Sequence, residues 1–379
     1  MRKIKISIVL VVLISVLFCK IEAYAFEENS QANLATVEKY MTRLFVNGYS
    51  WAYDLLSVST ILCEQKIENG ITEELYFVEF DVVLAANSVQ ELDYYKGVLD
   101  YCETFGTTDR LEVACTGDKV MTNAELQVFC QAMEIEKNEI YEHLNQYIDK
   151  EQVLSYCVLL RCDEAGNAEF FIEDGLGYIA AEDYFCSNSE KLRLSGYSRM
   201  EHKGEKILSA LNQVEAMVQN TVYDIADAVF YTEQYSSNPT SCNLHTACGK
   251  KVNTAMYNPA YENWANIHSD CANFMSQALY TAGIPTDSLW YPGSDTWINV
   301  AMLCSHMLNE GYWEEITADS LWVGDYMRYI GTEEKPESHI VLITAFDGAS
   351  YRYTAHTNDR KNYETDLDSS PRKFYRVIY

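Results

Sequence analysis

Glycine and proline are scarce in this chain, with 17 and 6 among 379 residues. That scarcity excludes a collagen-like protein, and the aromatic content of 13% excludes a disordered chain. Basic residues are also few: 28 Lys and Arg stand against 56 Asp and Glu, a formal net charge of −28. Phosphate contacts need basic clusters, so we expect no nucleic-acid partner. What remains is a large, acidic, globular protein whose length suggests two domains at about 150 residues each.

Long apolar runs are absent except at the N-terminus. Three basic residues within the first five positions precede a predominantly apolar run of 14 residues, Ile6 to Cys19, and Ala23-Tyr24-Ala25 supplies the small residues read by a signal peptidase. We predict a signal peptide over residues 1–25, cleaved before Phe26, and a secreted or cell wall-associated protein. The alternative is a membrane anchor, but a spanning helix needs about 20 apolar residues. Stable membrane insertion is therefore not expected.

Whether the number of cysteines is odd or even is informative in a secreted protein. Without Cys19 of the signal peptide, 11 of the 12 cysteines remain. Thiols tend to pair outside the cell, and an odd number leaves at least one without a partner within the chain. Cys242 and Cys248 bracket a polar loop and are the favoured disulfide. Together with His245 they offer three zinc ligands but no obvious fourth, so we expect no metal and no cofactor.

Hydrophobic periodicity predicts an α+β fold for the N-terminal part. The predicted elements are helices over 31–46 and 123–149, with Leu126, Phe129, Met133 and Ile135 facing a core, a strand over 75–84, and a hairpin of 156–161 with 168–172. We assign residues 26–203 to a small α+β domain of unknown role. It contains no catalytic constellation, because its one histidine before residue 200, His143, lies in a charged helix and is expected at the surface.

A heptad-like pattern over residues 204–234 predicts a long amphipathic helix. We therefore place a helical connector over 204–240, ended by the polar segment 236–241. The remainder, 241–379, forms the C-terminal domain, and it contains the residues suited to chemistry.

The first of these residues is Cys271. Asp270 is suited to cap a helix, an apolar stripe with a spacing of four residues follows, and Gly283 suits the C-terminal cap. Cys271 would lie in the first turn, where free N–H groups and the helix dipole lower a thiol pKa. Since the thiolate is the attacking species, Cys271 is the candidate nucleophile. The alternative is a buried structural cysteine or a disulfide partner.

His339 is the candidate base. It opens the apolar run 339–346, which reads as a buried strand, and it follows a polar loop. A histidine at the start of a strand can point its ring into a cleft while the strand fixes its backbone. The alternative is a histidine at the edge of the core, and His268 and His306 are expected to be structural.

A third residue should orient the imidazole of the base. If residues 351–359 form the strand paired with 339–346, His356 and Asn358 share a face because side chains alternate along a strand. Either could accept the imidazole proton, and the spacing alone does not decide between them.

Short motifs of the C-terminal part occur in a characteristic order over residues 250–362: Asn258-Pro259-Ala260-Tyr261, Asp270-Cys271-Ala272-Asn273-Phe274, Ser276-Gln277, Ala282-Gly283, Trp297, Gly324-Asp325, His339 and His356-Thr357. This part resembles the putative amidase domain of secreted and cell-envelope proteins of spore-forming bacteria, a relative of papain-like cell-wall amidases and endopeptidases. Ala272 and Met275 depart from the family's usual Asp-Cys-Thr-Asn-Phe-Val-Ser-Gln.

The resemblance implies a papain-like α+β domain with an antiparallel sheet. It also implies that Cys271 is the nucleophile, His339 the general base and His356 the orienting residue. Ala265 stands where papain has its oxyanion glutamine, so the backbone N–H of Cys271 is the first oxyanion donor to consider.

The function implied is that of a secreted cysteine hydrolase that cleaves an amide bond in peptidoglycan stem peptides or related peptides. The acidic composition favours a neutral or basic substrate over a polyanion. One alternative is a non-catalytic extracellular binding or envelope-structure protein on a papain-like scaffold. The other is a metallohydrolase, disfavoured because the sequence has no His-Glu-x-x-His or comparable ligand set.

Overall fold

The computed structural model describes residues 33–105, 123–175, 177–185, 188–212, 223–245, 250–331, 338–367 and 371–379. The signal peptide and Cys248, and with them the predicted cleavage and the Cys242–Cys248 disulfide, lie outside these residues. Eight cysteines are described, and no disulfide joins any two of them. None of the helices in the described ranges has the length and apolar character needed to span a bilayer.

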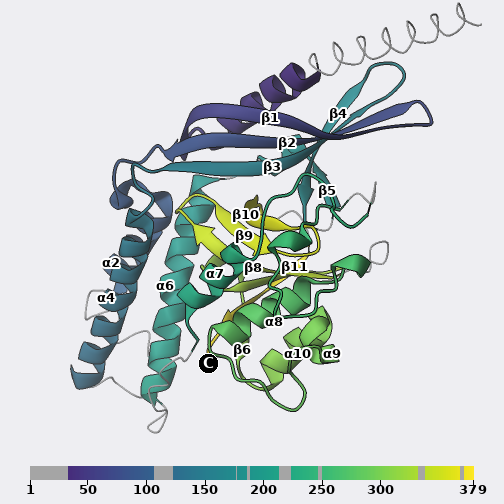
Figure 1. Cartoon of the computed structure of the whole chain (residues 1–379). Helices are drawn as coiled ribbons and strands as arrows, with labels where there is room; N and C mark the ends of the chain where they lie inside the picture. Colours follow the sequence, from purple (N-terminus) through teal and green to yellow (C-terminus); the bar gives the residue numbers. More distant parts are fainter. Residues whose placement is uncertain are drawn as a thin grey trace, which may run out of the picture.

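The protein is α+β, as predicted, and contains two antiparallel sheets (Figure 1). The strands of the N-terminal sheet, in spatial order, are β1 (Tyr53–Glu68), β2 (Ile71–Leu84), β3 (Glu151–Cys162), β4 (Ala168–Asp174) and β5 (Gly177–Ala180). Those of the C-terminal sheet are β10 (Arg360–Thr365), β9 (Tyr351–Ala355), β8 (His339–Phe346), β7 (Tyr326–Tyr329), β11 (Arg372–Val377) and β6 (Trp313–Ile316).

Helices flank both sheets. A helix over residues 33–49 precedes β1. The other α-helices are α2 (Asp93–Phe105), α4 (Asn123–Asn145), α5 (Ala181–Tyr184), α6 (Ser189–Asn212), α7 (Ile225–Gln234), α8 (Cys271–Thr281), α9 (Asp295–Ile298) and α10 (Val300–Asn309). Short 3-10 helices are η1 (Val89–Glu91), η2 (Thr254–Met256), η3 (Ala265–Ile267) and η4 (Ala318–Ser320). In Figure 1, α2, α4 and α6 stand along one flank, while α8, α9 and α10 cover the C-terminal sheet.

The C-terminal sheet is buried on both faces, which explains why β8 reads as a continuous apolar run. Val341 and Ile343 belong to the core shared with the N-terminal sheet. Ile340 and Leu342 point to the opposite face and pack with α7, α8 and α10. Alternate side chains of one strand thus fill two cores, and β8 is held firmly between them.

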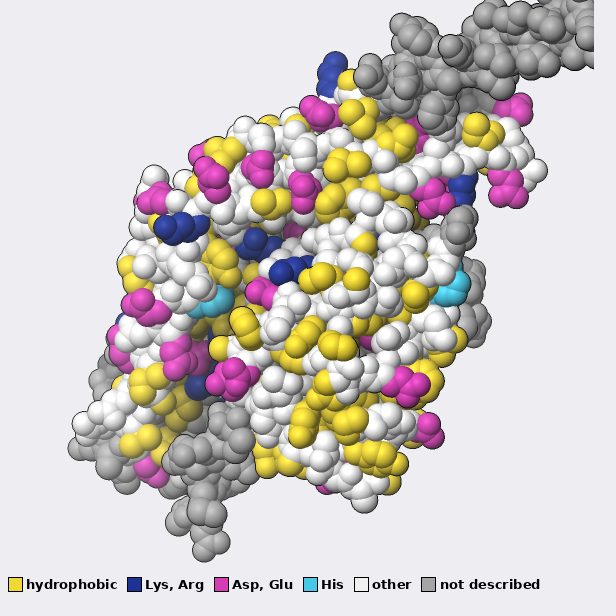
Figure 2. Space-filling view, viewed as in Figure 1, with side chains coloured by type: hydrophobic (Ala, Val, Ile, Leu, Met, Phe, Trp, Pro, Cys, Tyr) yellow, Lys and Arg dark blue, Asp and Glu magenta, His cyan; other side chains and the backbone are white. Residues whose placement is uncertain are grey.

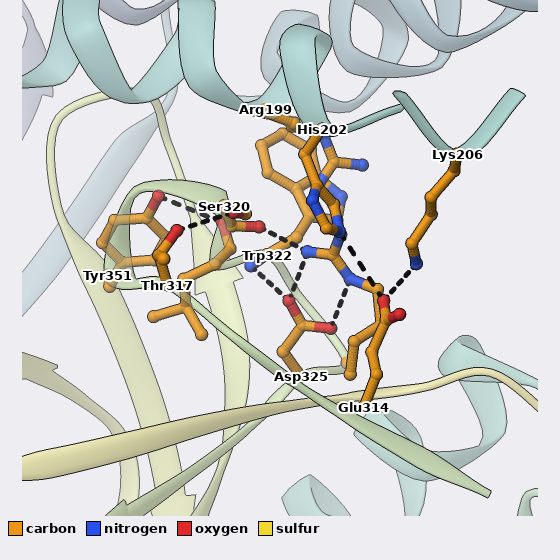
Figure 3. Close-up of polar contacts among 12 residues, drawn as sticks. Arg199, His202, Lys206, Glu314, Thr317, Ser320, Trp322, Asp325 and Tyr351 are labelled. Atoms are coloured by element: carbon orange, nitrogen blue, oxygen red, sulfur yellow. Dashed lines mark hydrogen bonds and ion pairs between the residues drawn. The ribbon is translucent and has the colours of Figure 1, made fainter. Parts of the chain in front are cut away.

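Polar contacts join α6 to the C-terminal sheet (Figure 3). Lys206 of α6 forms an ion pair with Glu314 of β6, and His202 lies 3.8 Å from the same carboxylate. Next to them, Arg376 of β11 binds Asp325 through two nitrogens, at 3.1 and 2.7 Å. These contacts, together with the shared core, attach the N-terminal part firmly to the C-terminal sheet.

Most predictions for the N-terminal elements are confirmed. The helix at 33–49, the strand at 75–84 within β2, and the hairpin of β3 and β4 are all present. Ile135 does not face the core as predicted; its side chain is 59% exposed on α4. His143, expected at the surface, is half-buried, and its Nε2 lies 2.8 Å from the carbonyl oxygen of Phe346.

The predicted connector helix over 204–240 differs in its limits. Its first part belongs to α6, which begins at Ser189. A separate helix, α7, begins after Asp224, whose carboxylate accepts a hydrogen bond from the backbone N–H of Asp227 at 3.1 Å. Residues 213–222 lie outside the described residues.

Candidate active site

Cys271 is the first residue of α8, as predicted, and its side chain is buried. Asp270 precedes it, but the Asp270 carboxylate does not cap the helix. Its Oδ1 accepts hydrogen bonds from the backbone N–H of Trp264 at 2.7 Å and from the Asn273 side chain at 2.9 Å. Its Oδ2 lies 2.7 Å from Nδ1 of His356. The carboxylate therefore ties the loop before α8 to the segment after β9.

The His356 ring is enclosed on every side. Its Nε2 lies 2.8 Å from the carbonyl oxygen of Tyr235, and its Nδ1 contacts Asp270. Its faces stack on Phe274, with centroids 3.5 Å apart, and on Tyr257, with centroids 3.6 Å apart. Because each nitrogen faces an oxygen atom and each face is covered by an aromatic ring, the imidazole is fixed in position.

The orienting role predicted for His356 stays a prediction, and its described contacts are with Asp270 and Tyr235. The strand β9 ends at Ala355, so the alternation that placed His356 and Asn358 on one face does not continue. Asn358 binds Glu173 through its amide nitrogen and accepts from the backbone N–H of Lys251 at 3.1 Å. Within the described part of the chain, no hydrogen bond joins either residue to His339. His356 instead fixes the start of the helix that carries Cys271.

Other residues of the sequence motif hold α8 from its sides. The indole N–H of Trp297 donates to Asn273 Oδ1 at 2.9 Å, and Ser276 Oγ donates to the Trp297 carbonyl at 2.8 Å. On α7, the Tyr231 hydroxyl donates to Gln277 Oε1 at 2.5 Å. The motif is thus mainly a scaffold that sets the position of one cysteine.

Cys271 and His339 line the same cavity, which has a volume of about 480 Å³. His339 begins β8, as predicted, and the backbone N–H of the next residue, Ile340, points toward the Cys271 sulfur. His268, expected to be structural, also lines this cavity. The structure therefore places two of the three predicted site residues, Cys271 and His339, in one cavity. The third, His356, is not among the described lining residues and contacts Asp270, which precedes Cys271.

Burial sets the protonation of the pair. It raises the pKa of the Cys271 thiol to about 11, against the opposing effect of backbone N–H groups of Ile340 and Ala272. The predicted net lowering of this pKa is therefore wrong, because burial outweighs the effect of the N–H groups at the helix start. Burial, followed by the charges of Lys250 and Arg360, lowers the pKa of His339 to about 3. At neutral pH the cavity thus holds a neutral thiol and a neutral imidazole.

The N-terminal sheet contributes to this site. Gly175, which follows β4, lines the cavity beside Cys271 and His339. The last residues of β4 reach into the C-terminal part, where Glu173 is buried and binds Lys251 at 3.4 Å and Arg360. These two cations outweigh the effect of burial and lower the pKa of Glu173 to about 2.

We expect Glu173→Gln to lower the free energy of unfolding by about 3–5 kcal/mol, because it leaves two buried cations without a carboxylate. Urea denaturation at pH 7 measures the change. Glu169→Gln is the matched control, since Glu169 is exposed on the same strand and should shift stability by less than about 0.5 kcal/mol. Equal midpoints for the two variants would show that Glu173 does not hold the two parts together.

Comparison with known families agrees with the motif. The family model described as the putative amidase domain matches residues 222–378. The C-terminal part thus matches the model of a putative amidase family. This confirms the resemblance inferred from the sequence, and it extends the domain to include α7, whose Tyr231 contacts α8. No curated protein and no solved structure matches the chain. The family assignment indicates hydrolysis of an amide and does not cover the N-terminal sheet.

Several lining residues were not predicted from the sequence. They are Gly175, Lys250, His268, Arg328, Asn299 and Ser338. Ser338 and His268 lie within three residues of His339 and Cys271 in the sequence, so this proximity could have indicated that they line the same cavity. Nothing in the sequence points to Gly175 or Arg328, which reach the cavity through the fold. Among the described residues, no group of three His, Cys, Asp or Glu side chains is placed to hold a metal ion.

Proposed function

We propose that this protein is a secreted cysteine hydrolase that cleaves an amide bond in peptidoglycan stem peptides or related peptides. The observation that carries the proposal is the cavity shared by Cys271 and His339 within a domain of the amidase family. The proposal of secretion rests on the predicted signal peptide. The proposed substrate class rests on the extracellular location and on the family match.

In the first step, the Cys271 sulfur attacks the amide carbonyl carbon while His339 takes the thiol proton. A base is needed at this point because burial keeps the thiol protonated at neutral pH. The backbone N–H groups near the start of α8 favour negative charge on the sulfur and on the carbonyl oxygen. His339 then gives its proton to the amine, the C–N bond breaks, and a thioester remains on Cys271.

In the second step, water replaces the amine. His339, neutral again, takes a proton from the water as its oxygen attacks the thioester carbonyl. The C–S bond breaks, the sulfur receives the proton, and the carboxylic acid product leaves. Throughout both steps, Asp270 and His356 keep Cys271 in place at the start of α8.

The test is detection of the thioester. Purified protein incubated with stem peptides from bacterial peptidoglycan is quenched in acid, digested and analysed by mass spectrometry. We expect an acyl group on the peptide that contains Cys271 and none on the peptide that contains Cys102, which lies on α2 away from the cavity. New amino groups in solution without acylation of Cys271 would contradict the proposed mechanism. Binding of the peptides with no hydrolysis would favour the non-catalytic alternative.

A further inference from the structure

The cavity has a charge that the composition of the chain does not suggest. Acidic residues outnumber basic ones twofold overall, and Figure 2 shows Asp and Glu side chains spread over the visible face. Yet the described residues that line the cavity include Lys250 and Arg328 and no Asp or Glu. The charged side chains among the described lining residues are therefore basic.

Arg328 is unusual among the arginines of the C-terminal sheet. Four others each bind a carboxylate, in the pairs Arg352–Asp347, Arg360–Glu173, Arg372–Asp174 and Arg376–Asp325. Arg328, on β7, is half-buried, and its Nε donates to Ser338 Oγ at 3.0 Å. Within the described ranges, no carboxylate forms an ion pair with it. A half-buried guanidinium that lines a cavity without a carboxylate is suited to bind an anion from solution.

The buried carboxylates behind the cavity wall are paired with other groups and do not neutralise Arg328. Glu173 lies there, but Lys251 and Arg360 share its single negative charge. The Asp270 carboxylate is paired with His356. Among the described lining residues, Arg328 thus offers a cation that is paired with no described carboxylate, and an anionic group entering the cavity would be attracted to it.

We propose that the substrate carries a carboxylate beside the scissile amide and that Arg328 binds this carboxylate. The proposal rests on the proposed function of Cys271 and narrows the substrate class to peptides with an acidic group next to the cleaved bond. It replaces the neutral or basic substrate suggested by overall composition. The planar guanidinium can hold both carboxylate oxygens and so place the amide carbonyl at the sulfur.

Two alkylating reagents test this proposal without knowledge of the substrate. Iodoacetate carries a carboxylate, whereas iodoacetamide has nearly the same size and no charge. The ratio of their second-order rate constants at one pH does not depend on the fraction of thiolate. Mass spectrometry of the Cys271 peptide gives this ratio, and the exposed Cys130 gives the reference ratio in the same sample.

We expect the ratio at Cys271 to exceed that at Cys130 by about tenfold, and Arg328→Gln to lower it by about fivefold or more. Arg328→Lys keeps the charge and should keep at least half of the ratio. Arg193→Gln is the matched control, since Arg193 pairs with Asp100 on the helical flank and its loss should change nothing. Circular dichroism establishes that each variant is folded.

An unchanged ratio in Arg328→Gln would overturn the proposal while leaving the proposed function intact. An equal fall in Arg328→Gln and Arg328→Lys would assign the effect to packing and would overturn it as well. If neither reagent alkylates Cys271, the sulfur is inaccessible from the cavity, and the proposed function itself fails. The two failures are thus distinguishable.

Discussion

Cys271→Ala should abolish amide hydrolysis, with a loss of about four orders of magnitude or more, and leave the fold intact. The loss follows because Cys271 is the proposed nucleophile and the one cysteine among the described residues that line the cavity. The fold survives because hydrogen bonds of Asp270 and Asn273 hold the start of α8 without using the sulfur. Release of amino groups from stem peptides measures the activity, and thermal unfolding measures the stability.

The matched control removes a different thiol. Cys102 on α2 packs at the edge of the main core and takes no part in the cavity, so Cys102→Ala should keep full activity. If Cys271→Ala retains turnover comparable to this control, the hydrolase does not depend on a cysteine nucleophile and the mechanism fails.

His339→Gln should lower kcat by about 10²–10⁴-fold, the usual contribution of a general acid–base group. Glutamine is similar in size and polarity but cannot take the thiol proton. His202→Gln is the control, because His202 faces Glu314 on the surface of α6.

The competing base is His268, which also lines the cavity. A loss in His268→Gln with none in His339→Gln would show that the wrong histidine has been assigned.

The pH profile gives a second readout of the same residue. The base form of His339 is the neutral imidazole, and its pKa is lowered to about 3. Activity should therefore stay level as the pH falls from 7 to about 4 and decline only as it approaches 3. A decline centred near pH 6.5, the usual value for histidine, would contradict the burial of this ring.

The positions of Cys271 and His339 could be predicted because local patterns determine them. Asp270 and Gly283 bracket a helix, and an unbroken apolar run after His339 indicates a strand buried on both faces. The structure places both residues at the starts of these elements. The order of the motifs along the chain then identified the family, which the domain match confirms.

The partners of His356, by contrast, could not be predicted. Its role depends on Asp270 and Tyr235, which are 86 and 121 residues away. The alternation rule failed because the chain leaves β9 just before His356 and turns, with Thr357 at φ +70° and Asn358 at φ +130°. The alternation of side chains along a strand does not predict side-chain orientation beyond the end of that strand.

One electrostatic prediction was wrong for a related reason. Helix position alone favours a thiolate at Cys271, but burial depends on the whole fold and raises the pKa instead. Overall acidity favours a neutral or basic substrate, and this stays a prediction; the fold places Arg328 of β7 and Lys250 in the cavity wall. Composition averages over the entire surface, whereas a substrate meets only the wall of one cavity.

The rate at which iodoacetamide alkylates Cys271 at pH 7, compared between the wild-type protein and His339→Gln, tests the central claim most directly. It requires no substrate and reports on the sulfur and its base alone. If His339 takes the thiol proton during attack, the second-order rate constant should fall by at least about tenfold in the variant. An unchanged rate constant would mean that the imidazole does not activate the sulfur, which would contradict the account.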